Sequence, residues 1–298
     1  MARFSWGGIR GKGIKLKSDI GMAVGALFLA TLVIILAYLV FERSAVQMYT
    51  TRINPIVKKA DIVVTQADKV WDSDLFTKTP DPLTNEIDPK AMRAEADSWS
   101  TTLATDATGI KAVKKSFADE PAPPNATTGL EAEITDYLNA TDAYVTDANA
   151  MVTYFDKLIT AEMEMNAAIR AVSYVQGLVN PAALHQRDAV LDEELGFIRK
   201  LSPPPSLQVF HEDTVRFLSD YTVVQKETTA AFETQAGLAT LEALGAEGES
   251  VIHSARDRLK ADVRTIRTGQ LGRDSLRARA HKMKTHDEVE RLRNKYKF

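Results

Sequence analysis

The chain has 298 residues, of which 45% are hydrophobic and 26% charged, and it contains no cysteine. A chain of this length can bury a sizeable core, whereas the absence of cysteine excludes disulfide bonds and a lipid anchor attached through a cysteine. The net charge of −3 is unevenly distributed. Residues 1–19 sum to about +4, residues 251–298 to about +8, and the residues between them to about −15.

Residues 20–41 form an unbroken run of 22 uncharged residues. As a helix this run reaches about 33 Å, enough to cross a hydrocarbon core of about 30 Å. A cleaved signal peptide has a shorter apolar region and a small-x-small cleavage site, but Arg43 occupies the position where a small residue is needed for cleavage after Ala45. The sequence therefore predicts an uncleaved membrane helix, and no other stretch predicts a second one.

Basic residues are slightly denser before this run than after it. Five precede it and four follow it closely: Arg3, Arg10, Lys12, Lys15 and Lys17, then Arg43, Arg52, Lys58 and Lys59. Because Lys and Arg near a span favour the cytoplasmic side, we predict a cytoplasmic N-terminus, a single pass through the cell membrane and an extracytoplasmic bulk. Two sequons, at Asn125 and Asn139, would be glycosylated only in a host with that machinery.

Small residues lie on one face of the predicted membrane helix, at Gly21, Gly25, Ala26 and Ala30. Small residues four apart allow two helix backbones to approach closely. This spacing predicts a packing face through which two copies of the chain can associate, although such matches are also common by chance.

The helix is expected to continue beyond the membrane, because apolar residues recur there at steps of three and four. This seam consists of Val46, Tyr49, Ile53, Ile56, Ala60, Val63, Ala67 and Val70. It favours packing inside the chain's own bundle over packing against a second copy. Pro55 interrupts the hydrogen-bond ladder and predicts a kink or a restart.

Proline clusters divide the rest into helices. A second helix is predicted from an Asp88 cap and Pro89, and a third from a Thr128–Glu131 capping box to Asn180-Pro181. Further helices are predicted over about 182–200 and from Pro205 to about 243. Gly245 and Gly248 predict a soft turn, and a basic helix broken near 269–272 follows.

Together these elements predict an all-α fold. A single N-terminal transmembrane helix continues into an antiparallel extracytoplasmic bundle of about four long helices, with a basic C-terminal helix. The expected divisions are a cytoplasmic basic tail (1–19), the transmembrane helix (20–41), an acidic helical bundle (42–250) and a basic helical segment (251–298).

The basic segment predicts contact with an anionic partner. Its candidate contact residues are Arg273, Arg277, Arg279, Lys282, Lys284, Arg291 and Arg293. They can pack on the chain's own acidic body or on a neighbour's. Alternatively they can bind anionic lipid or a cell-surface polymer. Nucleic acid is not expected, since no recognised motif for it is present.

The sequence predicts no catalytic residue, metal site or cofactor. The five histidines are His185, His211, His253, His281 and His286, and none has Glu three residues before it, as helical-bundle metal sites require. We expect all five at the surface. Tyr154, Phe155, Met163, Met165 and Tyr174 can line a ligand pocket, but such residues more often form core.

The anchor-and-bundle plan resembles the extracytoplasmic sensor domains of bacterial chemoreceptors and sensor kinases. Those receptors return through the membrane with a second helix, for which residues 42–298 offer no apolar run. The preferred hypothesis is therefore a non-enzymatic structural or protein-interaction module, with a protein partner or a second copy and membrane lipids as its contacts. The alternative is a ligand-binding sensor that signals through a partner protein.

Overall fold

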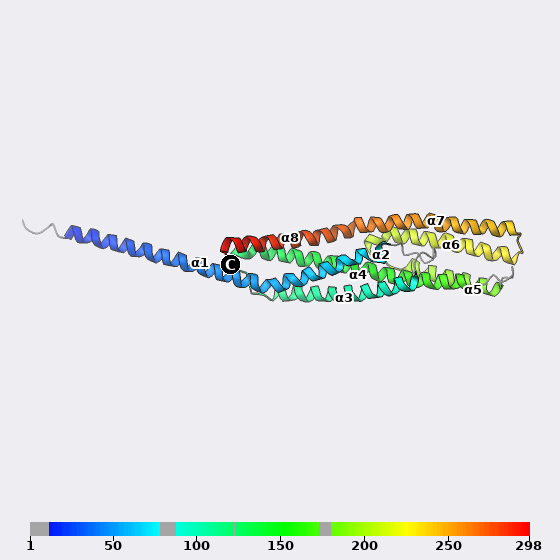
Figure 1. Ribbon diagram of the computed structural model, residues 1–298, viewed down its shortest axis with the longest axis horizontal. Helices are drawn as coiled ribbons and strands as arrows, with labels where there is room; N and C mark the ends of the chain where they lie inside the picture. The colour runs from blue at the N-terminus through cyan, green and yellow to red at the C-terminus, as the bar shows by residue number, and fades with distance from the viewer. Residues whose placement is uncertain (1–11, 78–87, 122, 173–179) are drawn as a thin grey trace, which may run out of the picture.

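The computed structural model describes residues 12–77, 88–121, 123–172 and 180–298. Within these residues the chain is helical and contains no strand. Seven of the described helices have 20 residues or more, and they form an elongated bundle from which the N-terminal part of the first helix projects (Figure 1). The prediction of an all-α fold is confirmed, whereas the expected number of about four long helices was too small.

The first helix, α1 (Lys12–Lys69), contains the whole apolar run and continues into the bundle without interruption. Within the described residues it is the one helix that is long and apolar enough to span a membrane. Its side chains from residue 26 to residue 41 are all exposed. Pro55 lies inside α1 and does not end it, and Figure 1 shows the helix changing direction where it enters the bundle.

The seam that continues from the apolar run is buried in the bundle. Each of its members is at most 7% exposed: Val46, Tyr49, Ile53, Ile56, Ala60, Val63, Ala67 and Val70. After α1 the chain makes the turn η1 (Val70–Asp72) and the short helix α2 (Asp74–Thr77). Burying this seam against other helices of the same chain joins α1 to the bundle through apolar contacts.

Three helices follow, and side-chain caps define two of their starts. α3 (Pro89–Ala118) begins after Asp88, whose carboxylate accepts a hydrogen bond from the backbone N–H of Lys90. α5 (Pro181–Lys200) begins after Asn180 in the same way. α4 (Thr128–Ala171) follows the turn η3 (Asn125–Thr127), and the predicted capping box is wrong because the Thr128 hydroxyl donates to the carbonyl of Asn125 instead.

The C-terminal third differs from the prediction at one boundary. After the turn η4 (Pro205–Leu207), α6 (Gln208–Glu233) ends ten residues before the expected end, and α7 (Leu238–Thr268) begins after Gly237. The turn between them places Gln235 in the left-handed region, with φ 52°. Gly245 and Gly248 therefore lie inside α7 and form no turn. The break before α8 (Gln270–Tyr296) falls at Gly269, within the predicted range.

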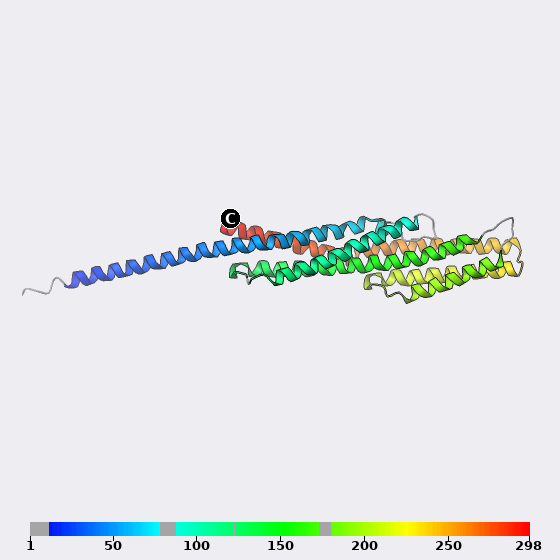
Figure 2. The same cartoon turned by 90° about the horizontal axis from the view of Figure 1, so that it is seen from below.

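α4 is the central helix and contacts α1, α3, α5 and α8. α1 and α4 run in the same direction, whereas α3 and α8 run in the opposite one (Figures 1 and 2). α7 and α8 together run back along the bundle for about 85 Å, at about 1.5 Å per residue. They bring the C-terminus beside the entry of α1, and residue 251 lies inside α7 rather than at the boundary of a separate segment.

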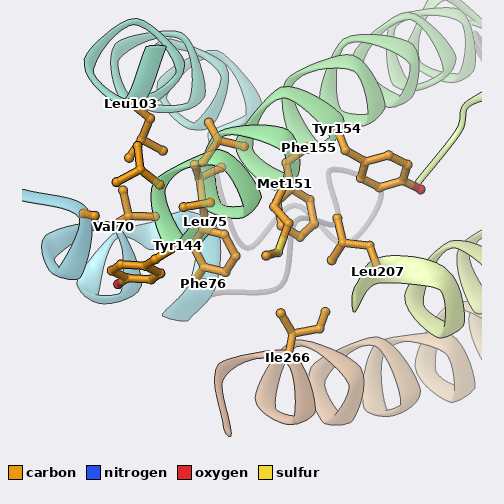
Figure 3. Packing of buried hydrophobic residues seen from close by; sticks show 14 of the residues in the cluster. Val70, Leu75, Phe76, Leu103, Tyr144, Met151, Tyr154, Phe155, Leu207 and Ile266 are labelled. Atoms are coloured by element: carbon orange, nitrogen blue, oxygen red, sulfur yellow. The ribbon is translucent and has the colours of Figure 1, made fainter. Parts of the chain in front are cut away.

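The core joins the two ends of the bundle through aromatic side chains on α2, α4 and α6. The ring of Phe155 lies between Phe76 and Phe210, with centroids 5.4 Å from each and edge-to-face geometry. Figure 3 shows Leu207 and Ile266 approaching the same cluster from η4 and α7. The core is therefore continuous between the helices nearest α1 and those at the far end.

Candidate interaction surface

The inner face of α8 is held to α1 and α4 by two polar layers. In the first, the Asp68 carboxylate accepts hydrogen bonds from Tyr144 (2.8 Å), Ser275 (2.9 Å) and the Arg279 guanidinium (2.7 and 2.9 Å). Two apolar residues of α8, Ala278 and Leu292, are fully buried. This layer fixes the register of α8 against both neighbours.

The second layer repeats the first one heptad away. The Asp61 carboxylate accepts a hydrogen bond from Tyr137 (2.7 Å) and lies 3.1 Å from Nε2 of His286 and 3.8 Å from Nζ of Lys282. On all three helices the members of the two layers are seven residues apart, a spacing that keeps them on one helix face. The three helices are thus aligned by matched carboxylates and donors.

Both tyrosines are buried donors to these carboxylates. Burial raises the pKa of Tyr137, and the hydrogen bond and charge of Asp61 raise it further. Burial likewise raises the pKa of Tyr144, and the charge of Asp68 adds to this shift. Tyr144 also accepts a hydrogen bond from Trp71. The phenols therefore stay protonated and donate hydrogen bonds to the aspartate carboxylates.

The end of α8 contacts α1 directly beyond the apolar run. The Tyr296 hydroxyl donates to the carboxylate of Glu42 (2.8 Å), and the Arg43 guanidinium donates to the carbonyl of Lys297 (2.7 Å). Lys295 and Lys297 are exposed beside these contacts. The C-terminal end of the bundle is thereby fastened to the residues that follow Phe41, the last residue of the apolar run.

The opposite side of α8 is an exposed stripe of cationic and apolar side chains, which we call the outer face of α8. It consists of Arg273, Leu276, Arg277, Met283 and Lys284. Leu276 and Met283 are 64% and 63% exposed, the largest exposed apolar side chains of this helix. Its three cations form no ion pair within the part of the chain that the structure describes. It is available to a partner with acidic and apolar groups.

The seven predicted contact residues of the basic segment therefore divide by position. Arg279 and Lys282 face the chain's own α1, and Arg291 and Arg293 pair with Glu288 and Glu290 on their own helix. Arg273, Arg277 and Lys284 remain exposed. Of the predicted membrane-packing residues, Ala26 and Ala30 are exposed. For Gly21 and Gly25 the structure describes the helical backbone of α1 and not the surroundings of the residues.

The residues considered for a ligand pocket belong to the core. Tyr154, Phe155 and Met165 are buried, Met163 packs partly buried against them, and Tyr174 lies outside the described residues. His211 is also buried, so its expected place at the surface was wrong. Its Nδ1 lies 2.8 Å from the Tyr154 hydroxyl, and burial lowers its pKa.

A cleft of about 380 Å³ lies instead between α6 and α7. Tyr221, Phe232 and Glu249 are among the residues that line it. Periodicity could not have located it, because the boundary between these two helices was misplaced. The polar layers did leave a signal in the sequence, since Asp61 and Asp68 are seven residues apart and so are Tyr137 and Tyr144.

The chain matches no protein-family model, no curated protein and no solved structure.

Proposed function

We propose that this chain is a single-pass membrane protein whose bundle lies outside the cytoplasm and serves as a non-enzymatic interaction module. The observation that carries the proposal is the fastening of Tyr296 and Lys297 to Glu42 and Arg43. With α1 in a membrane, this contact keeps the C-terminal end of α8 at the membrane surface, beside the point where α1 enters the bundle. The bundle is then attached to the membrane through α1 alone, and its lateral surfaces are accessible to partners.

The outer face of α8 is the proposed binding surface. Arg273, Arg277 and Lys284 supply positive charge beside Leu276 and Met283, which supply apolar area. Charge complementarity favours an acidic protein surface as the partner. The acidic residues 42–250 of a second copy meet the same description, so self-association through this face belongs to the proposal.

The C-terminal end adds a contact with lipid. Phe41 ends the apolar run, so residues 42 and 43 lie in the headgroup region once α1 spans the membrane. Lys295 and Lys297 then lie near the headgroups, and anionic lipid in that leaflet would attract their positive charges. This supports a bundle held upright by its own C-terminus.

Topology is tested with the full chain fused at its C-terminus to alkaline phosphatase, which is active outside the bacterial cytoplasm, or to a fluorescent protein that folds inside it. We expect phosphatase activity and no fluorescence from the second fusion. Fluorescence with an inactive phosphatase would reverse the orientation. A soluble product that lacks residues 1–41 would instead identify the apolar run as a cleaved signal.

Binding by the outer face is tested with a photo-crosslinking residue at Leu276 or Met283 in membranes of the native host. Val223 on α6, 53% exposed, is the matched control position. We expect a discrete adduct from the two α8 positions, with either a second copy or an acidic protein, that is lost when Arg273, Arg277 and Lys284 are changed to Glu. Equal crosslinking from Val223, or an adduct that survives the charge reversal, would contradict the proposal.

A second candidate function is ligand sensing in the cleft between α6 and α7. The observation in its favour is the placing of two aromatic side chains and a carboxylate, those of Tyr221, Phe232 and Glu249, in one concave site. Such a site suits a small cationic or amphipathic molecule. Thermal-shift screening of such compounds against the purified chain and a Phe232→Ala variant tests it, and a shift that is equal in both would contradict it.

A further inference from the structure

Three metal-ligating side chains converge beside the second polar layer. Glu133 and Asp136 lie one turn apart on α4, and His281 approaches them from α8. One ligand atom of each residue lies within 4.8 Å of the other two. Spacing along the sequence could not reveal this group, because its histidine lies almost 150 residues from its carboxylates.

Two of these ligand atoms are buried without a hydrogen-bond partner in the described chain. They are Nδ1 of His281 and Oε2 of Glu133. The His281 side chain is only 16% exposed. The two atoms form an ion pair with each other at 3.5 Å when the histidine is protonated. Neither makes a hydrogen bond, so a group that bonds to both would satisfy them.

Their separation suits a metal ion better than a hydrogen bond. Nδ1 of His281 and Oε2 of Glu133 are 3.5 Å apart, which is long for an N–H···O bond. Zinc bonds imidazole nitrogen and carboxylate oxygen at about 2.0–2.2 Å in tetrahedral geometry, so neighbouring ligand atoms lie about 3.4 Å apart. A carboxylate oxygen of the exposed Asp136 lies within 4.8 Å of the ligand atoms of His281 and Glu133 and is the candidate third ligand.

We propose that Glu133, Asp136 and His281 bind a divalent transition-metal ion of the zinc class. One imidazole and two carboxylates suit zinc, whereas magnesium and calcium require six or more oxygen ligands. Water completes the four-coordinate site. The ion joins α8 to α4, at the point where the Thr285 hydroxyl also contacts the carbonyl of Glu133. Its role is to hold α8 in place, and the site does not depend on what the outer face of α8 binds.

The test uses the full chain in detergent, purified through a tag without histidine and stripped with chelator. Cobalt(II), which reports tetrahedral coordination by its visible absorption, is titrated first and then displaced by zinc. We expect one equivalent of cobalt, and a zinc-dependent rise of the melting temperature. His281→Gln and Glu133→Gln should each weaken binding by roughly tenfold or more, since even neighbouring residues alter metal affinity by that factor.

The matched control is His286→Gln, which removes the other α8 histidine, the one beside Asp61. It should leave cobalt binding unchanged. Absence of a cobalt band in the parent chain, or equal affinity in the parent and in His281→Gln, overturns the proposal. Circular dichroism establishes that each variant is helical, and Glu133→Gln decides the question if His281→Gln does not fold.

Discussion

Arg279 on α8 forms a salt bridge with Asp68 on α1, with 2.7 Å between Nη2 and Oδ2, although 211 residues separate them in the chain. The carboxylate of Asp68 is mostly buried, and the guanidinium is half exposed. An ion pair with one partner half exposed contributes little by itself. Its importance comes from Tyr144 and Ser275, which donate to the same carboxylate and make Asp68 the shared acceptor of α1, α4 and α8.

Replacing Asp68 by Ala should loosen α8. The change removes the acceptor of Tyr144 and leaves that buried hydroxyl without its carboxylate partner, so we expect a loss of about 2–3 kcal/mol in the free energy of unfolding. Urea unfolding followed by circular dichroism measures the loss, and hydrogen exchange should show faster exchange in α8 than in α3. Asp72→Ala is the control, because Asp72 is exposed. Equal losses in the two variants would contradict the role given to Asp68.

Asp262 on α7 should make stability depend on pH. Burial, together with the charge and hydrogen bond of Asp213 on α6, raises the pKa of Asp262 to about 6 from its ordinary value of 3.8. The folded state therefore holds this proton more tightly than the unfolded state. The contribution of Asp262 to stability is greatest below about pH 4 and is lost as the pH rises through 6.

Asp262→Asn removes the free-energy cost of ionising this buried carboxyl, because the amide stays neutral. Allowing for solvent screening of a partly exposed group, we expect a gain of about 1 kcal/mol at pH 7.5 that disappears below about pH 4. Melting temperatures of the parent and the variant between pH 4 and 8 measure it. A gain that is the same at both ends of this range would show that Asp262 is not the titrating group.

Arg187 on α5 should be among the most sensitive charged positions. Its side chain is almost fully buried, and Nη2 donates to Asp188 (2.8 Å) and to the hydroxyl of Thr229 on α6 (2.8 Å). Arg187→Met leaves the Asp188 carboxylate buried without its counter-ion, which should cost about 3–5 kcal/mol in unfolding free energy. Arg199→Met removes a comparable α5–α6 contact with Ser219 at the surface, and it should cost less than about 1 kcal/mol.

Local chemistry explains which parts of the fold could be predicted. The cap at Asp88 depends on a few adjacent residues, and the helix start predicted there is confirmed. Asn180-Pro181 was predicted only as the end of the preceding helix, and in the structure Asn180 caps α5. The seam of α1 depends only on periodicity, and its residues are buried. The end of α6 was misplaced because the turn at Gln235 contains no proline, and the flanking residues fit a helix. Gly245, which lies inside α7, was wrongly interpreted as marking a turn.

The candidate site was less predictable, because it depends on tertiary register. The basic composition of α8 indicated an anionic partner, but composition does not distinguish Arg279, which faces Asp68, from Arg277, which faces solvent. That distinction requires knowing that α8 returns along α1 in the opposite direction. The approach of His281 to Glu133 depends on the same register.

The junction of α7 and α8 should not tolerate a side chain at Gly269. A Cβ atom there would lie 2.7 Å from the carbonyl oxygen of Thr265, which belongs to the backbone and cannot move aside. Gly269→Ala should therefore cost about 1–3 kcal/mol in unfolding free energy and shift the position of α8. Gly245→Ala is the matched control: a Cβ at Gly245 meets nothing within 4 Å, and the residue lies inside α7. Alanine should stabilise that helix by about 0.5–1 kcal/mol. Thermal unfolding of both variants measures these opposite effects, and a gain in both would mean that the α7–α8 junction does not need glycine.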